Sequence, residues 1–445
     1  MRPTYLGAIL PRHRVFSQTG NCARLGAETG GKAGQMTGEQ ALEHQQDVFR
    51  RQVFYIPGYD PMLPRRYREL YRSEGAMQAD ISGYSLDIKG NQGTETYSWS
   101  VQSDIQRQKT QTGVAFLLWS DIVQSSMDRS IPGTFLLLLR VVWIYVSTGA
   151  LFRLMRLRKG PVIAALYPIF MLSLQLIIAI TIGYSIAFGV GKFLPIWVAI
   201  TMGVGGLVWV MLWFRKLDNK LFAYYLLHDY AFSAQYYGAS PPELEARMQD
   251  FGDQIARALA SDVDEVLVIG HSSGAHIGVT VLADLLRRHS VTADHPKLAF
   301  LTLGHVVPMV SFLPKADRLR GDLHYLSQQT SLTWIDVTAP GDGCTFALCD
   351  PVSVSGAAPD TGKIWPLVFS AAFTQSLSKD RYDSLKYRFF RLHFQYLCAF
   401  DQPKDYDYFQ ITSGPLSLSA RFKDRAPSPS RITTAQSGYQ SMAAP

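Results

Sequence analysis

One serine stands where a short apolar run meets a helix-like segment, in a setting that would make it a nucleophile. The run at 265–269 leads into Gly-His-Ser-Ser-Gly at 270–274, and a helical pattern continues to 288. A strand that turns this sharply into a helix lifts the central hydroxyl above the sheet. The helix N-terminus directs backbone N–H groups at the same place. An ordinary strand–helix connection could hold a serine by chance, but an amphipathic helical pattern at 243–259 precedes it and favours Ser272 as a catalytic residue.

A serine hydroxyl is a poor nucleophile near neutral pH, so it needs a general base and an acid that orients the base. In a strand–elbow–helix setting the acid follows the serine along the chain and the histidine follows the acid. Three aspartates fit: Asp336 within a predicted strand, Asp342 in the loop after it, and Asp350 further on. The loop position favours Asp342, with Asp350 as second choice. Each could instead stabilise a turn beside Gly or Pro.

The base is predicted by elimination. His393 is the one histidine downstream of all three aspartates, and it lies in Phe-Arg-Leu-His-Phe-Gln-Tyr. We interpret the remaining histidines as structural or solvated: His13, His44, His228, His271, His276, His289, His295, His305 and His324.

The developing oxyanion needs backbone donors. The residue after the nucleophile, Ser273, supplies one N–H group, and the loop after an early strand at 53–56 supplies the other from Gly58 or Tyr59. Glycine at this place lets the backbone approach a ligand closely.

The elements around these residues alternate between strands and helices. Besides the early strand and the run before Ser272, apolar stretches predict strands at 97–101, 114–119, 298–303 and 332–338, and a basic helix at 64–72. This alternation favours an α/β fold with a mostly parallel sheet.

Two long apolar segments interrupt this pattern. Residues 160–191 carry no charge, and residues 193–214 carry none either. About 20 apolar residues cross a bilayer core, so we expect a transmembrane helical hairpin with spans near 163–188 and 193–214. A soluble apolar cap is the alternative. A third stretch, 134–152, contains Arg140 and is expected at the interface or packed on the domain.

The sequence also predicts an orientation. One folded domain cannot have its halves on opposite faces of a membrane, so the number of crossings is even, and two is the simplest count. The loop between the spans offers only Lys192. The segments that flank the hairpin in the sequence, before the first span and after the second, carry seven cations: Arg153, Arg156, Arg158, Lys159, Arg215, Lys216 and Lys220. Because cations favour the cytoplasmic side, we expect the catalytic domain in the cytoplasm.

Composition excludes several other classes. The 445-residue chain has a net charge of +7, which juxtamembrane cations and anionic headgroups explain; no basic patch interleaved with aromatics suggests nucleic acid. The four cysteines show no metal-ligand spacing, and we expect no metal or cofactor. A P-loop-like sequence at 26–33 lacks the Ser or Thr that would hold magnesium.

These features divide the chain into five parts. Residues 1–46 and 416–445 are expected to be disordered. Residues 47–130 and 223–415 form the two parts of the catalytic domain, and residues 131–222 form the membrane insertion.

Together these residues resemble the α/β-hydrolase superfamily, and most closely its uncharacterised bacterial members with transmembrane helices inside the hydrolase domain. The resemblance is carried by Phe-Tyr-Ile-Pro-Gly at 54–58, the elbow at 270–274, Asp-Gly-Cys at 342–344, Cys-Asp-Pro at 349–351 and Leu-His-Phe-Gln-Tyr at 392–396. It implies an α/β-hydrolase fold and ester hydrolysis by Ser272, His393 and Asp342. The expected partners are membrane lipids and a small amphiphilic ester substrate. Acyl transfer through the same triad, or a non-catalytic membrane binding module, are the alternatives, and the oligomeric state stays open.

Overall fold

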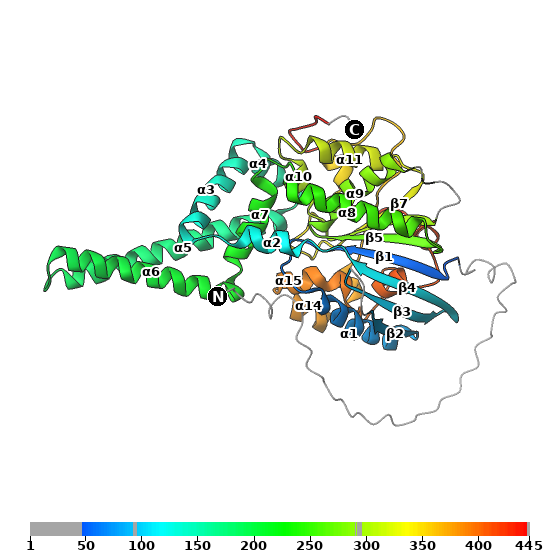
Figure 1. Ribbon diagram of the computed structural model, residues 1–445, viewed down its shortest axis with the longest axis horizontal. Coiled ribbons are helices and arrows are strands. Elements are labelled where there is room, and N and C mark those ends of the chain that lie inside the picture. The colour runs from blue at the N-terminus through cyan, green and yellow to red at the C-terminus, as the bar shows by residue number, and fades with distance from the viewer. Residues whose placement is uncertain (1–46, 92–95, 290, 292–295, 443–445) are drawn as a thin grey trace, which may run out of the picture.

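A single eight-stranded sheet forms the centre of the protein, in a computed structural model that describes residues 47–91, 96–289, 291 and 296–442 (Figure 1). The strands lie in the order β2-β3-β4-β1-β5-β6-β7-β8. From β4 to β8 neighbouring strands are parallel, whereas β2, β3 and β4 are joined antiparallel. The strands are β1 (Arg50–Ile56), β2 (Ser85–Gly90), β3 (Ser98–Ile105), β4 (Gln108–Phe116), β5 (Glu265–His271), β6 (Lys297–Leu303), β7 (Leu332–Thr338) and β8 (Leu367–Ser370). This arrangement confirms the predicted α/β fold with a mostly parallel sheet.

Helices cover both faces of the sheet. On one face lie α8 (Pro242–Leu259), α9 (Gly274–Arg288) and α11 (Asp317–Leu326), and on the other α1 (Pro64–Ser82), α14 (Lys379–Leu385) and α15 (Phe389–His393) (Figure 1). The helical spacing expected before the elbow becomes the buried face of α8: Leu244, Met248, Phe251, Ile255 and Leu259. Every residue of β5 is buried, as expected of a strand that is covered on both faces.

The antiparallel edge was predicted only in part. The expected strands at 97–101 and 114–119 correspond to β3 and β4, which extend over a long hairpin, and β2 was not predicted at all. Gln106 and Arg107 form the turn between β3 and β4 with φ of 58° and 62°. Such turns usually carry Asn or Gly, so the residues here gave no turn signal.

The two parts of the chain on either side of the insertion share this one sheet. Strand β1 lies between β4, which also precedes the insertion, and β5, which follows it, with Phe54 paired to both Ala115 and Val268. The inserted segment must therefore leave the domain and return to it, as a helical hairpin does.

That hairpin consists of α5 (Lys159–Val190) and α6 (Ile196–Leu221), which project together away from the domain (Figure 1). Both helices are long and apolar enough to cross a membrane. Their backbones lie close together at Gly183 and Gly203, where a Cβ added to either glycine would lie 2.7 Å from the other's carbonyl oxygen. Small residues at such contacts are typical of helices that pack within a bilayer. The expected start of the second span at 193 falls in the turn before α6, because Pro195 caps the helix.

Helix α3 (Ile131–Ser147) occupies the third apolar stretch, followed by α4 (Ala150–Leu154). One face packs on the domain beside α7 (Ala223–Ala234), and Tyr145 donates a hydrogen bond to the carbonyl of Met309. Arg140 donates to the carbonyl of Gln235, which explains a charge within this stretch. The opposite face exposes Leu136, Leu139 and Trp143, each more than 60 % exposed.

The end of the chain corrects one prediction. Residues 416–442, expected to be disordered, pack on the domain. Helix α17 (Leu418–Arg421) follows a buried contact in which the amide N–H of Leu418 donates to Glu265, and Ile432 pairs with Cys349. The composition suggested disorder because few of these residues are apolar, yet their backbone groups find partners far away in the sequence. The predictions for residues 1–46 and 26–33 lie outside the described residues.

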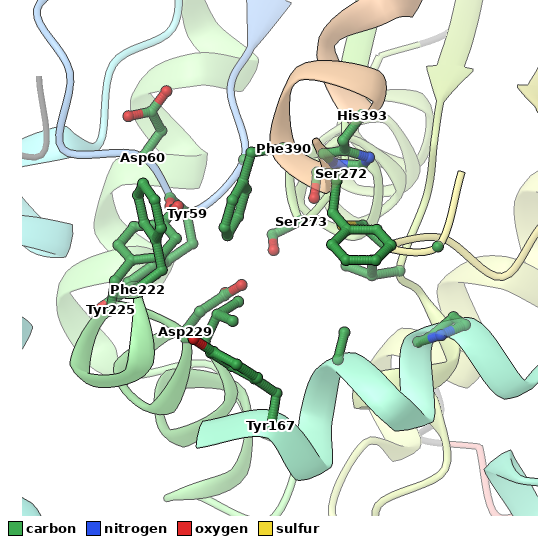
Figure 2. A pocket seen from close by; sticks show the side chains of 18 of the residues that line it. Tyr59, Asp60, Tyr167, Phe222, Tyr225, Asp229, Ser272, Ser273, Phe390 and His393 are labelled. Carbon is green, nitrogen blue, oxygen red and sulfur yellow. The ribbon is translucent and has the colours of Figure 1, made fainter. Parts of the chain in front are cut away.

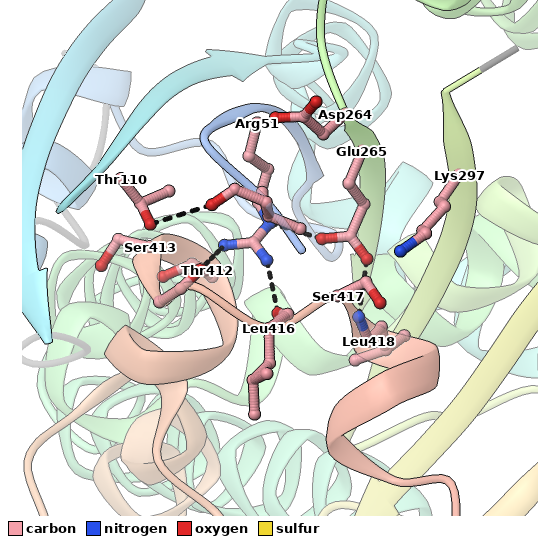
Figure 3. Close-up of polar contacts among 12 residues, drawn as sticks. Arg51, Thr110, Asp264, Glu265, Lys297, Thr412, Ser413, Leu416, Ser417 and Leu418 are labelled. Carbon is pink, nitrogen blue, oxygen red and sulfur yellow. Dashed lines mark hydrogen bonds and ion pairs between the residues drawn. The ribbon is translucent and has the colours of Figure 1, made fainter. Parts of the chain in front are cut away.

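Arg51 and Glu265 anchor this segment at the start of β1 and β5 (Figure 3). The guanidinium donates to Glu265 at 2.5 Å and to the carbonyls of Gly414 and Leu416 at 2.8 and 2.7 Å. The two charged side chains are at most 1 % exposed. All three nitrogens of Arg51 are therefore bonded within the protein.

Candidate active site

The predicted elbow forms a tight turn between β5 and α9. Ser272 has φ of +56°, a left-handed conformation that is strained for a residue with a side chain. The turn is closed by glycines: a Cβ at Gly274 would lie 2.1 Å from the carbonyl oxygen of Ile56, and one at Gly270 2.7 Å from Ala275. The local sequence therefore forces this backbone geometry, which holds the hydroxyl of Ser272 at the end of β5.

His393 and Asp342 come together beside this serine. The imidazole Nδ1 of His393, at the end of α15, lies 2.8 Å from Asp342 Oδ2. Asp342 is 2 % exposed, and its other oxygen accepts the amide N–H of Cys344 at 2.9 Å. Both oxygens of the Asp342 carboxylate thus accept hydrogen bonds. Nδ1 of His393 is bonded to Asp342, and its other ring nitrogen, Nε2, forms no hydrogen bond within the described part of the chain.

Neither of the other two aspartates reaches His393. Asp350 caps α12 (Pro351–Val354) by accepting two amide N–H groups and pairs with Lys363 at 2.5 Å. Asp336 accepts a hydrogen bond from Thr302 at 2.6 Å inside the sheet, and burial raises its pKa well above the usual range. Asp350 therefore has the turn-stabilising role that the sequence left open for each candidate.

His271, expected to be structural, contacts His393 directly. Its ring stacks on that of His393 with centroids 4.8 Å apart. Its Nε2–H group donates to the backbone carbonyl of His393 at 3.2 Å. Burial and the neighbouring His393 lower the pKa of His271 well below its usual value, so it stays neutral and can donate this bond.

The serine, the histidine and the expected oxyanion donors face one cavity of about 900 Å³ (Figure 2). The structure describes no hydrogen bond between the Ser272 hydroxyl and His393, although both line this space; such bonds often tighten only when substrate is bound. Gly58 lies against Ser272, where an added Cβ would be 2.9 Å from the Cβ of Ser272. Within the described residues, the backbone N–H groups of Gly58, Tyr59 and Ser273 donate to no backbone carbonyl.

The cavity extends to the base of the helical hairpin. Its wall includes the start of α5 and the end of α6, where Tyr167 donates to the carbonyl of Leu221 at 2.6 Å. Helix α7 forms the side opposite Ser272 and His393 and contributes Tyr225, Asp229 and Tyr230. An amphiphilic molecule that reaches Ser272 can therefore contact the same helices that could enter the bilayer.

Asp229 is a cavity residue that the sequence analysis did not select. Figure 2 shows its carboxyl group pointing into the cavity from the wall opposite Ser272 and His393. Burial raises the pKa of Asp229 to about 7, against a smaller opposing effect of His393. The sequence did offer a signal for Asp229. It is an acidic residue within the aromatic-rich segment 222–232, and an aromatic-rich segment of this kind is expected to be buried.

Asp342, Cys344 and His393 could also be considered as metal ligands, since their donor atoms lie within 4.8 Å of one another. Burial raises the pKa of the Cys344 thiol well above its usual value. A neutral thiol is a poor ligand, and the Asp342–His393 bond already uses Nδ1. These residues fit an acid–histidine pair better than a metal centre.

Comparison of the chain with protein-family models, with curated proteins and with solved structures finds no match in any of the three. The functional interpretation therefore depends on the geometry of the cavity and on the sequence around it.

Proposed function

We propose that this protein is a membrane-anchored serine hydrolase of the α/β-hydrolase type that cleaves a carboxylic ester. The single observation that supports this best is the elbow, in which Ser272 has φ of +56° beside the His393–Asp342 pair at 2.8 Å. Strain of this kind persists where function requires it. A structural serine would have no reason to occupy such a turn at the mouth of a cavity.

The proposed reaction follows from the free atoms. His393 Nε2 takes the proton of Ser272 as the oxygen attacks the ester carbonyl, since Nδ1 is bonded to Asp342. The N–H groups of Ser273 and of Gly58 or Tyr59 stabilise the oxyanion. His393 returns the proton to the departing alcohol and leaves an acyl group on Ser272. Water, activated by the same histidine, then releases the acid and restores the serine. No cofactor is needed for these steps.

The hairpin supports an amphiphilic substrate. Helices α5 and α6 carry many exposed apolar side chains, among them Phe170, Tyr184 and Trp197, each at least 66 % exposed. Such side chains are stable in lipid and costly in water. With the hairpin in a bilayer, the exposed apolar face of α3 lies close to the membrane surface, and the cavity opens near acyl lipids.

A serine-directed probe tests the chemistry. A fluorophosphonate should label the full chain and should not label Ser272→Ala. Ser273→Ala is the matched control, because this neighbour also lines the cavity but supplies only its backbone. Labelling of Ser272→Ala at the wild-type level would overturn the proposal.

We also propose that the catalytic domain faces the cytoplasm, since cations flank the hairpin on the domain side and only Lys192 lies at its tip. Single cysteines introduced near Gly191 and near Ser428 can be tested with a membrane-impermeant thiol reagent on intact cells. The first should react and the second should not. The reverse pattern would invert the topology, and a chain that is soluble without detergent would show that the hairpin is a buried cap.

A further inference from the structure

Three cations stand at the rim of the active-site cavity: Lys220, Arg388 and Arg391. Lys220 belongs to the last turn of α6, and Arg388 and Arg391 flank the start of α15. All three line the cavity. Among the residues that the structure describes, none of their side chains forms an ion pair or hydrogen bond. We call these three residues the cationic rim.

Aromatic packing brings the rim together from distant parts of the chain. The ring of Phe390, between the two arginines, lies 4.8 Å from that of Phe222 and 5.8 Å from that of Tyr225, centroid to centroid. Phe222 follows Lys220 by two residues at the end of α6. The start of α15, with both arginines, is therefore fastened to the base of the hairpin close to Lys220, and all three cations line the same cavity.

The two arginines of the rim repel each other. The pKa of Arg391 is lowered, first by burial and then by the charge of Arg388. Like charges held close together without a counter-ion favour binding of an anion. The neighbouring aromatics Tyr387 and Phe389 are 78 % and 57 % exposed, and alternation of aromatic and cationic residues is typical of segments at the membrane–water interface.

The distribution of charges within the cavity favours one orientation of a bound substrate that has an anionic group. Asp229 points into the interior, and a second lining acid, Asp60, is bonded to Tyr67 at 2.5 Å and to the amide N–H of Met62 at 2.8 Å. Burial raises the pKa of Asp60 to about 6 and that of Asp229 to about 7, so both carboxyls are at least partly ionised near neutral pH. An anionic group is then disfavoured beside them and favoured at the rim. A substrate with a negative headgroup would thus keep it outside and present its neutral acyl ester to Ser272.

From this arrangement we propose that the cationic rim is a headgroup subsite, and that the substrate is an acyl ester of an anionic, phosphate-bearing membrane lipid. This proposal rests on the proposed ester hydrolysis and specifies its substrate class. The rim lies where the hairpin leaves the domain, so the phosphate is presented by the membrane surface.

Two pairs of substitutions separate the rim from general attraction to an anionic membrane. Arg388→Gln/Arg391→Gln removes two rim charges, and the matched control Arg215→Gln/Lys216→Gln removes two charges from the same end of α6 that do not line the cavity. Both are compared in proteoliposomes, by fatty-acid release from phosphatidylglycerol and from phosphatidylcholine. Hydrolysis of a short uncharged ester reports whether each variant retains a working triad.

We expect the rim variant to lose about tenfold or more in kcat/KM on phosphatidylglycerol, as for loss of charged hydrogen bonds, with little change on phosphatidylcholine or the short ester. The juxtamembrane control should lose much less. Equal losses in the two variants, or an unchanged rim variant, would overturn the subsite. Inorganic phosphate should inhibit hydrolysis of the short ester only weakly, and phosphatidylglycerol vesicles should inhibit it more strongly. If inorganic phosphate inhibited as strongly as the vesicles, the rim would be a site for free phosphate and not for a lipid headgroup.

The proposed function and the subsite fail in different ways. Activity of Ser272→Ala on the short ester would refute the serine mechanism whatever the rim does. An inactive Ser272→Ala together with no headgroup preference in the wild-type chain would refute the subsite alone.

Discussion

The sheet carries a buried polar cluster near each end of its central strands, and the two clusters differ in what they leave unbonded. Where β1 and β5 begin, Arg51 and Glu265 bond each other and the backbone at Gly414, Leu416 and Leu418 (Figure 3). This cluster is closed, because every guanidinium nitrogen and both carboxylate oxygens have partners.

The opposite ends of the strands carry an open cluster. Asp342 and Nδ1 of His393 are bonded, but the Ser272 hydroxyl and the Asp229 carboxyl face the cavity (Figure 2). Both side chains are half-buried in the cavity wall, and neither forms a hydrogen bond among the described residues. Under the proposed function, the first cluster serves stability, whereas the second keeps atoms available for a substrate.

The largest effect is expected at the open cluster. Asp342→Asn should lower kcat/KM by about ten-thousandfold, because an amide cannot hold His393 in the tautomer that the reaction needs. Thermal unfolding should change little. Rates on a short ester and unfolding in the same detergent measure both. A variant with near-normal activity would show that Asp342 is not the orienting acid.

At the closed cluster the effects should be reversed. Arg51→Met leaves the Glu265 charge buried without its partner and should destabilise the fold by about 3–5 kcal/mol, as for other broken buried pairs. Activity per folded molecule should stay near wild type. Chemical denaturation followed by circular dichroism measures the first, and probe-based counting of active sites normalises the second. Arg51→Met combined with Glu265→Gln should recover part of the loss; no recovery would mean that packing rather than charge is responsible.

Asp229 tests the cost of an open carboxyl through pH. Burial raises its pKa to about 7 from an ordinary 3.8, so between these values the folded protein holds a proton that the unfolded chain has released. Stability therefore falls as pH rises through this window, by at most about 4 kcal/mol. Asp229→Asn cannot ionise, so its stability advantage over wild type should be small near the lower pKa and grow towards alkaline pH. An advantage that is independent of pH would contradict this origin.

The smallest effect separates the two aspartates that the sequence left as alternatives. Asp350→Asn should keep activity near wild type and lose about 1 kcal/mol of stability, since Asp350 caps α12 and pairs with Lys363. Its activity is measured beside that of Asp342→Asn. An inactive Asp350→Asn with an active Asp342→Asn would exchange their roles.

Local sequence was sufficient to predict the strand, turn and helix around Ser272 in the candidate site. Strand β5, the turn at Ser272 and helix α9 follow from neighbouring residues, because apolar runs, glycines and helical spacing act over a few residues. The two long helices of the hairpin follow from uninterrupted apolar composition. Chain order alone selected His393, which the structure pairs with Asp342; its role as the base stays a prediction.

Tertiary structure decided what depends on distant contacts. The choice between Asp342 and Asp350 required the 2.8 Å approach of a histidine 51 residues away. Packing of residues 416–442 depends on Arg51 and Glu265, hundreds of residues earlier. The cationic rim exists because the end of α6 and the start of α15 meet through aromatic rings. Each of these contacts joins residues that are far apart in the sequence, and the residues next to them in the sequence do not indicate which distant residue they will meet.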